Sequence, residues 1–232
     1  MRPKLGGNSS KEKTTMLKAV IMDFDGLILD TEVIWYQIFA KWFKENKNYN
    51  LSVEEFLKCV GSNPESLFKY LEIKYNLKID RKEFLRDTED QFLKQCQTLP
   101  PKEGVIDFVK SVKEARLKLS LATSGTRSKS ISQLTRLDLL DYFDLIITGE
   151  DVKRIKPFPD LFLETIKRLG IIKSETIIFE DSLNGLIAGQ KAGINVFLIP
   201  NEVTKHSNFE NYFDKKESLK QVDIRKIISR YN

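Results

Sequence analysis

The sequence has little of the residues on which many enzymes build their chemistry. His206 is its one histidine, and Cys59 and Cys96 are its two cysteines, far apart and in no CxxC pair. A metal site of several histidines is therefore not expected, and neither is chemistry built on a histidine base unless His206 carries it alone. Two cysteines without a secretory signal suit a reducing compartment, so we expect structural thiols and a cytoplasmic protein.

Long apolar runs and an excess of one charge are also missing. No apolar run approaches the ~18 residues that a membrane span requires. The net charge is +5, but residues 1–16 carry three of those charges, which leaves +2 on the rest of the chain. We therefore expect neither a membrane nor a nucleic acid as partner. Residues 1–16 are polar, with Gly and Ser, and we expect either a disordered tail there or an added extension before an original start at Met16.

Most of the chain alternates between strand-like and helix-like segments. Short apolar segments end in polar residues, at 17–24, 117–123, 143–148, 176–181 and 195–200. Helical spacing lies between or after them, near 103–115, 127–137, 158–169, 183–192 and 216–230. This alternation predicts an α/β fold, a doubly wound, Rossmann-like parallel sheet with helices on both faces.

Residues 33–98 differ, because their apolar residues follow helical spacing and no convincing strand lies among them. Ser52 with Glu55, and Asp80 with Glu83, have the spacing of a capping box at a helix start. "LPPKEG" then breaks the chain before the alternation resumes. We expect a core domain of residues 17–32 and 99–232, with a small helical cap domain of residues 33–98 inserted after the first strand.

Acidic residues follow two of the predicted strands. The stretch "AVIMDFDGLILDTE", residues 19–32, passes from a buried strand straight to Asp23 and Asp25, and the strand at 176–181 ends in Glu180 and Asp181. Asp is depleted in strands and costly to bury unpaired, whereas ligands bind beyond the carboxyl ends of parallel strands. Carboxylates gathered at that edge suit Mg²⁺, which prefers oxygen ligands.

The other two strand ends carry groups that suit phosphate. Thr123, Ser124 and Gly125 offer hydroxyls and backbone amides before a helix, and Lys156 offers a positive charge in a proline-stiffened loop. Each element alone has an ordinary explanation, such as a helix cap or a surface lysine. Four such elements at four strand ends together predict a site for magnesium and a phosphate ester.

These motifs, "DFDGLILDTE", "TSG", the lysine of "IKPFP" and "FEDSLNG", resemble the four motifs of haloacid dehalogenase-like hydrolases. The resemblance covers about residues 17–232, in the expected order and spacing. The helical insert looks like the cap of the β-phosphoglucomutase-like subgroup, and the segment "DTEVIW" looks closer to the sugar-phosphate phosphatases of that subgroup. The resemblance also implies a monomer.

The resemblance implies a role for each motif residue. Asp23 would be the nucleophile that forms an aspartyl-phosphate, and Asp25 the general acid and base. Thr123, Ser124 and Lys156 would bind phosphate. The metal ligands would be the side chains of Asp23, Asp181 and Glu180 and the backbone carbonyl of Asp25. Because dehalogenases of the family lack this second Asp, and the ion-pumping ATPases have Thr in its place, Asp25 favours rapid phosphate chemistry.

Two alternatives remain open. A β-phosphoglucomutase-type mutase resembles the chain throughout, but its histidine after the first motif is replaced by Trp35, and its cap-loop arginine is missing from "VGSNPESL". A non-catalytic binding protein on the same fold is disfavoured by the complete motif set. Trp35 is a candidate pocket residue or a core aromatic, and Gly61, Ser62 and Asn63 form a candidate substrate-reading loop or a plain connection.

The sequence therefore predicts a Mg²⁺-dependent phosphatase of small phosphorylated metabolites, most simply sugar or polyol phosphates.

Overall fold

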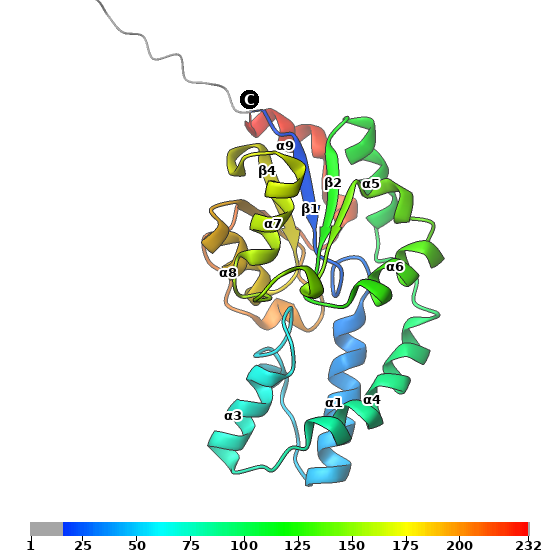
Figure 1. Ribbon diagram of the computed structural model, residues 1–232, viewed down its shortest axis with the longest axis vertical. Helices are drawn as coiled ribbons and strands as arrows, with labels where there is room; N and C mark the ends of the chain where they lie inside the picture. Colours follow the sequence, from blue (N-terminus) through cyan, green and yellow to red (C-terminus); the bar gives the residue numbers. More distant parts are fainter. Residues whose placement is uncertain (1–15, 232) are drawn as a thin grey trace, which may run out of the picture.

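A six-stranded parallel sheet forms the centre of the protein (Figure 1). The computed structural model describes residues 16–231. The strands are ordered β3-β2-β1-β4-β5-β6. Their bounds are Ala19–Met22 (β1), Lys118–Ala122 (β2), Leu145–Ile147 (β3), Thr176–Glu180 (β4), Asn195–Leu198 (β5) and Asp214–Lys215 (β6). The predicted fold class is confirmed, and the two-residue edge strand β6 is the strand that the sequence pattern did not predict.

Strand β1 is buried on both faces, as a central parallel strand must be. Val20 and Met22 pack in one apolar cluster and Ile21 in another, because successive side chains point to opposite faces. The first cluster includes residues of α5 (Val105–Glu114), α6 (Arg127–Arg136) and α9 (Ile224–Tyr231). The second includes residues of α7 (Asp160–Leu169) and α8 (Leu183–Ala192).

The strand order reverses at β1. Strands β2 and β3 extend the sheet on one side of β1, whereas β4, β5 and β6 extend it on the other. In a doubly wound sheet such a reversal leaves a crevice beyond the carboxyl ends of the strands. Asp23 and Asp181 directly follow the two neighbouring strands β1 and β4, and therefore lie at this crevice.

Four helices lie between β1 and α5, below the sheet in Figure 1, with no strand among them. They are α1 (Thr31–Lys47), α2 (Val53–Phe56), α3 (Glu65–Tyr75) and α4 (Arg81–Cys96). The capping box at Ser52 and Glu55 is confirmed, with both reciprocal hydrogen bonds. At α4 only the Asp80 half is present, since its carboxylate accepts from the backbone of Lys82 and Glu83. These helices and their loops form most of an apolar cluster, in which Phe39 and Phe84 pack edge to face and which Val203, after β5, completes.

The two connections to these helices are tied together. The chain leaves β1 after Met22 and returns through Lys102, whose backbone N–H donates to the Ile28 carbonyl at 2.9 Å. The Lys102 ammonium also donates to the Gly26 carbonyl at 2.6 Å. The outgoing and returning segments are therefore held side by side.

The loop between α2 and α3 contacts the crevice of the sheet. Asn184 donates to the Val60 carbonyl at 2.8 Å, and Ser124 donates to the Gly61 carbonyl at 3.0 Å. Ser62 in turn donates to the Lys156 carbonyl at 2.5 Å. This loop therefore closes over the carboxyl ends of the strands, and the conformation is a closed one.

The predicted helix boundaries agree with the structure within a few residues, apart from the last helix. The pattern predicts a helix over 216–230, but Leu219–Gln221 forms a separate 3-10 turn and α9 begins only at Ile224. Asp223 accepts from the Arg225 backbone N–H, so a new helix start interrupts the expected single helix. The predicted disordered tail lies outside the described residues, except for Met16.

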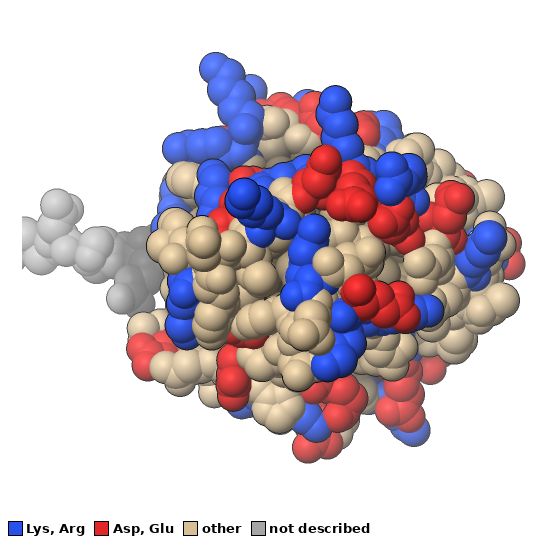
Figure 2. Space-filling view, turned by 90° about the horizontal axis from the view of Figure 1, so that it is seen from below, with Lys and Arg blue, Asp and Glu red and all other residues tan. Residues whose placement is uncertain are grey.

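No helix in the described part of the chain is long and apolar enough to cross a membrane. Figure 2 views the molecule from the end that carries the inserted helices. Basic and acidic side chains are interspersed on this face, and neither kind covers it continuously.

We predict that Gly61→Ala lowers the free energy of unfolding by about 1–3 kcal/mol more than Gly170→Ala does. Gly61 has a φ of +74°, and an added Cβ would lie 2.2 Å from Ser182 Oγ. Gly170 has a similar φ of +67° but nothing within 4 Å of the added Cβ, so it is the matched control for backbone strain. Urea unfolding of both variants measures the difference, and equal losses would show that Gly61 is not packed against Ser182.

Candidate active site

Asp23 and Asp25 lie where β1 ends, on either side of Phe24. Asp23 is 2% exposed, and its backbone N–H donates to the Phe179 carbonyl of β4. Gly26 turns the chain back at once, with a φ of +78° that disfavours other residues. An added Cβ at Gly26 would meet the Asp181 carboxylate at 2.1 Å, so the glycine also makes room for that acid.

Lys156 contacts two of the acids, Asp23 and Glu180. Its fully buried ammonium donates to Asp23 Oδ1 at 2.5 Å, to Glu180 Oε1 at 2.6 Å and to the Ala122 carbonyl at 2.9 Å. Burial alone would lower the pKa of Lys156, but the two carboxylates raise it above its ordinary value. Burial also raises the pKa of Asp23, to about 7, against the opposing effect of Lys156.

The two acids after β4 have different partners. Glu180 Oε2 accepts from the backbone N–H groups of Asp181 and Ser182 and from the Ser182 hydroxyl, so both of its oxygens are occupied. Ser182 is the N-cap of α8. Asp181 Oδ2 accepts from the Asn201 amide at 2.7 Å, while Asp181 Oδ1 is buried and has no hydrogen-bond partner.

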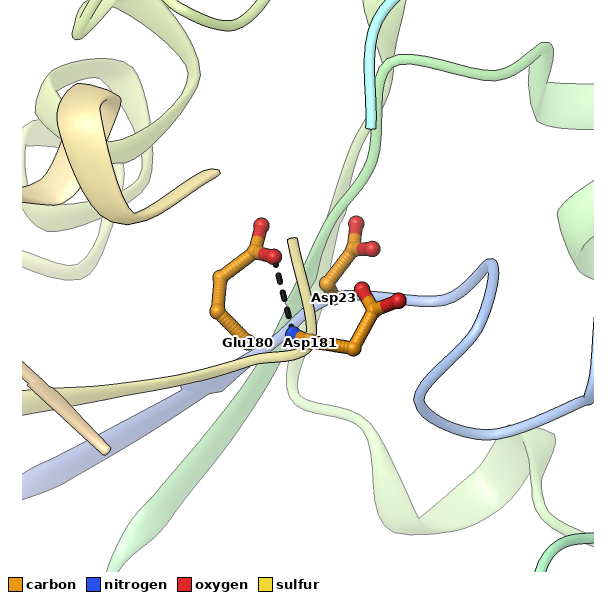
Figure 3. Close-up of side chains that lie close together, drawn as sticks. All are labelled: Asp23, Glu180 and Asp181. Atoms are coloured by element: carbon orange, nitrogen blue, oxygen red, sulfur yellow. Dashed lines mark hydrogen bonds between the residues drawn. The ribbon is translucent and has the colours of Figure 1, made fainter. Parts of the chain in front are cut away.

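These carboxylates fit a hard divalent cation. Asp23, Glu180 and Asp181 each offer an oxygen within 4.8 Å of the others (Figure 3). Burial, then Glu180, then Asp23, raise the pKa of Asp181 well above its ordinary value, because negative charge is costly there. A divalent cation would relieve that cost and satisfy the unpartnered Oδ1, and an all-oxygen donor set is the kind that Mg²⁺ prefers.

The residues predicted to bind phosphate follow β2. Thr123 is buried, and its hydroxyl accepts from the Gly125 backbone N–H at 3.1 Å. Thr123, Ser124 and Gly125 line the same cavity as Asp23 and Asp25. We name residues 123–125 the phosphate loop.

This cavity, of about 520 Å³, lies between the sheet and the inserted helices. Its two walls differ in character. Trp35 of α1 and Leu85, Phe92 and Leu93 of α4 form a largely apolar wall, which also includes Glu89 of α4. Ser128, Lys129, Ser132 and Gln133, all on α6, form a polar wall. The volume is ample for a small metabolite, since ligand pockets run from about 300 to 1,000 Å³.

The structure also places the predicted cap residues at this cavity. Trp35, Gly61, Ser62 and Asn63 all line it. Trp35 stacks on Phe92, with ring centroids 3.8 Å apart, so it is both a pocket residue and part of an aromatic cluster. Asn63 accepts from the Glu65 backbone N–H at the start of α3, which gives it a local structural contact as well. His206 is exposed and does not line the cavity.

Sequence reasoning missed three residues at the site. Asn201 follows β5 and holds Asp181, so extending the strand-end rule to the fifth strand would have found it. Thr31 and Lys129 both donate to Asp25 Oδ1 at 2.7 Å. Nothing in the sequence distinguishes Lys129 from the many lysines on solvated helix faces.

Glu32 is a further buried acid at the cavity, and we predict that it makes the protein less stable as pH rises. Burial, then the nearby Asp25, raise the pKa of Glu32 to about 8, and Lys129 opposes them. Unfolded Glu titrates near ~4.3. Between these values the folded state holds a proton that the unfolded state has lost, so stability falls with rising pH, by up to about 1.4 kcal/mol per pH unit.

Glu32→Gln should remove this contribution. Urea unfolding with a chelator present, at pH 5, 6.5 and 8, should show a smaller loss of stability with pH in the variant than in the unsubstituted protein. The raised pKa values of Asp23 and Asp181 also lower the stability as pH rises, and they do so in both proteins. The difference between the pH slopes of the two proteins therefore reports Glu32. Identical pH slopes would contradict the prediction.

The comparisons with known proteins agree with this geometry. A family model for haloacid dehalogenase-like hydrolases matches residues 20–199. The Bacillus subtilis protein named "Putative phosphatase YhcW" is 34% identical over 94% of this chain and 99% of its own length. A Thermotoga maritima phosphorylated carbohydrates phosphatase is 33% identical over 77% of this chain and 82% of its own length.

Solved structures show the same fold. The crystal structure of a Clostridium difficile β-phosphoglucomutase superposes with a TM-score of 0.77 at 24% identity, covering 94% of this chain and 98% of its own. At 24% identity this similarity supports the fold alone. The family match spans the strands and loops that hold every acid of the site, and the chain therefore belongs to the haloacid dehalogenase-like hydrolase family.

Proposed function

We propose that this protein is a magnesium-dependent phosphatase that hydrolyses small phosphate monoesters through an aspartyl-phosphate on Asp23. The observation that carries the proposal is the buried arrangement in which Lys156 pairs with Asp23 while the unpartnered oxygen of Asp181 lies close by. The name of the Bacillus subtilis relative includes phosphatase, and that of the Thermotoga maritima relative includes phosphorylated carbohydrates.

In the first half-reaction Asp23 attacks the phosphorus of the ester. The new bond joins a carboxylate oxygen to phosphorus, and the bond from phosphorus to the leaving oxygen breaks. Asp25 gives its proton to that oxygen, so an alcohol leaves. Lys156 holds one oxygen of Asp23 and thereby leaves the other for attack.

In the second half-reaction a water molecule attacks phosphorus. Asp25, now a carboxylate, accepts a proton from this water, the bond to Asp23 breaks, and inorganic phosphate leaves. Thr123 and Ser124 hold the phosphoryl oxygens in both steps. They are well placed for this because the phosphate loop lines the cavity beside both aspartates.

The side chains of Asp23 and Asp181, with the backbone carbonyl of Asp25, would hold magnesium. Its charge, with that of Lys156, would offset the negative charge of the phosphoryl group. Glu180 stays a predicted ligand, although both of its oxygens are engaged by Lys156 and the start of α8.

The residues that line the cavity favour some classes of substrate over others. Sugar or polyol phosphates are the class predicted from sequence, and the Thermotoga maritima relative is consistent with that class. The apolar wall formed by Trp35, Leu85, Phe92 and Leu93 favours an alcohol with an apolar or ring face over an acyclic polyol. Among small phosphate esters we therefore expect ring-bearing compounds to be preferred to glycerol phosphates.

The direct test is phosphate release from a panel of esters, with Mg²⁺ and with excess chelator. The panel contains hexose 6-phosphates, glycerol phosphates, benzyl phosphate, nucleotides and β-glucose 1-phosphate. We expect release that depends on Mg²⁺ and is lost on chelation. Full activity in excess chelator would remove the metal from the proposal. Conversion of β-glucose 1-phosphate to glucose 6-phosphate without release would favour the mutase, and inactivity on every ester would favour a binding protein.

We also predict that Asp23→Asn lowers kcat by roughly 10⁴-fold or more, because the nucleophile is lost. Rapid quenching with a ³²P-labelled substrate should trap a labelled protein that the variant does not form. Asp90→Asn, an exposed acid on α4, is the matched control and should keep normal turnover. Turnover near normal in Asp23→Asn would show that another group is the nucleophile.

A further inference from the structure

Lys129 forms an ion pair with Asp25, the proposed acid and base. Its ammonium donates to Asp25 Oδ1 at 2.7 Å, and each of the two side chains is 17% exposed. Thr31, in the first turn of α1, donates to the same oxygen at the same distance. Oδ1 is thus held by two donors, one on α6 and one on α1.

The other carboxylate oxygen of Asp25 faces the phosphate loop. Asp25 Oδ2 would lie 3.5 Å from a Cβ added at Gly125, and the Thr123 hydroxyl would lie 3.4 Å from the same point. The two donors on Oδ1 therefore turn Oδ2 toward the place where the phosphate ester is proposed to bind. A proton transferred by Asp25 has to leave from, or arrive at, an oxygen that reaches that place.

Lys129 is also held by the inserted helices. Its ammonium lies 4.5 Å from the centre of the Phe92 ring, a cation–π contact with α4. Phe92 stacks on Trp35 of α1, with an angle of 10° between the rings. The lysine thus bridges the acid at the sheet and the apolar wall of the cavity, and this contact exists only while the inserted helices lie close to α6.

We propose that Lys129 is a positioning residue for Asp25. It fixes Oδ1 so that Oδ2 carries the proton to the leaving oxygen, and its contact with Phe92 makes this alignment coincide with closure over the cavity. The inference rests on the proposed function, in which Asp25 is the general acid. Lys129 itself exchanges no proton and touches no reacting atom.

The test compares esters that differ in their need for an acid. Benzyl phosphate has a poor leaving group that needs a proton, whereas 4-nitrophenyl phosphate leaves readily as an anion. The parameter is kcat/KM, because it covers only the steps up to the phosphorylation of Asp23. Lys129→Met keeps the length and apolar stem of the side chain and removes its charge.

We expect Lys129→Met to lower kcat/KM for benzyl phosphate by roughly 10- to 100-fold, and for 4-nitrophenyl phosphate by less than about 3-fold. Lys129→Arg should restore part of the loss, since it keeps a charged donor. Phe92→Leu should show a smaller loss of the same selective kind. Lys94→Met, an exposed lysine on α4, is the matched control and should change neither value.

Asp25→Asn separates this inference from the proposed function. If it loses activity selectively on benzyl phosphate and Lys129→Met does not, the positioning role is overturned while the acid role stands. If Asp25→Asn loses activity on both esters equally, the acid role itself fails. Equal losses on both esters in Lys129→Met, with an unchanged unfolding temperature, would assign Lys129 a merely structural role and overturn the inference.

Discussion

The buried ammonium of Lys156 is the interaction on which the site depends. Three buried carboxylates gathered within 4.8 Å would repel one another strongly. Lys156 compensates two of them, and both contacts are short and fully buried. Removing one partner of a buried pair typically costs about 3–5 kcal/mol, because the other charge is left uncompensated. The lysine therefore stabilises the fold at the point where the proposed chemistry takes place.

The negative charge of Glu180 is stabilised by backbone N–H groups as well as by Lys156. It accepts from Lys156 on one oxygen and from the first residues of α8 on the other, so it joins β4, α8 and the loop that carries Lys156. Ser182 at the same point caps α8 and lies against Gly61 of the loop between α2 and α3. Three distant parts of the sequence, around Gly61, Lys156 and Glu180, thus meet where the strands end.

The sequence predicted correctly those features that depend on the local residue pattern and on the order of the strands. Apolar strands ending in Asp23, Thr123 and Asp181 located the site, because parallel strands place their carboxyl ends at one edge. Lys129 and Thr31 were not predicted as site residues. They belong to the site because they contact Asp25, and no local sequence pattern indicates that contact. The last helix was predicted too long because the cap at Asp223 was overlooked, and β6 has too few residues to show a period.

The paired connections near Lys102 have a consequence for how the cavity opens. Because the outgoing and returning segments are hydrogen-bonded to each other, the inserted helices are attached at one narrow base, not at two separate points. Such an attachment couples the two connections, so the inserted helices can change their position relative to the sheet only by movement at that shared base.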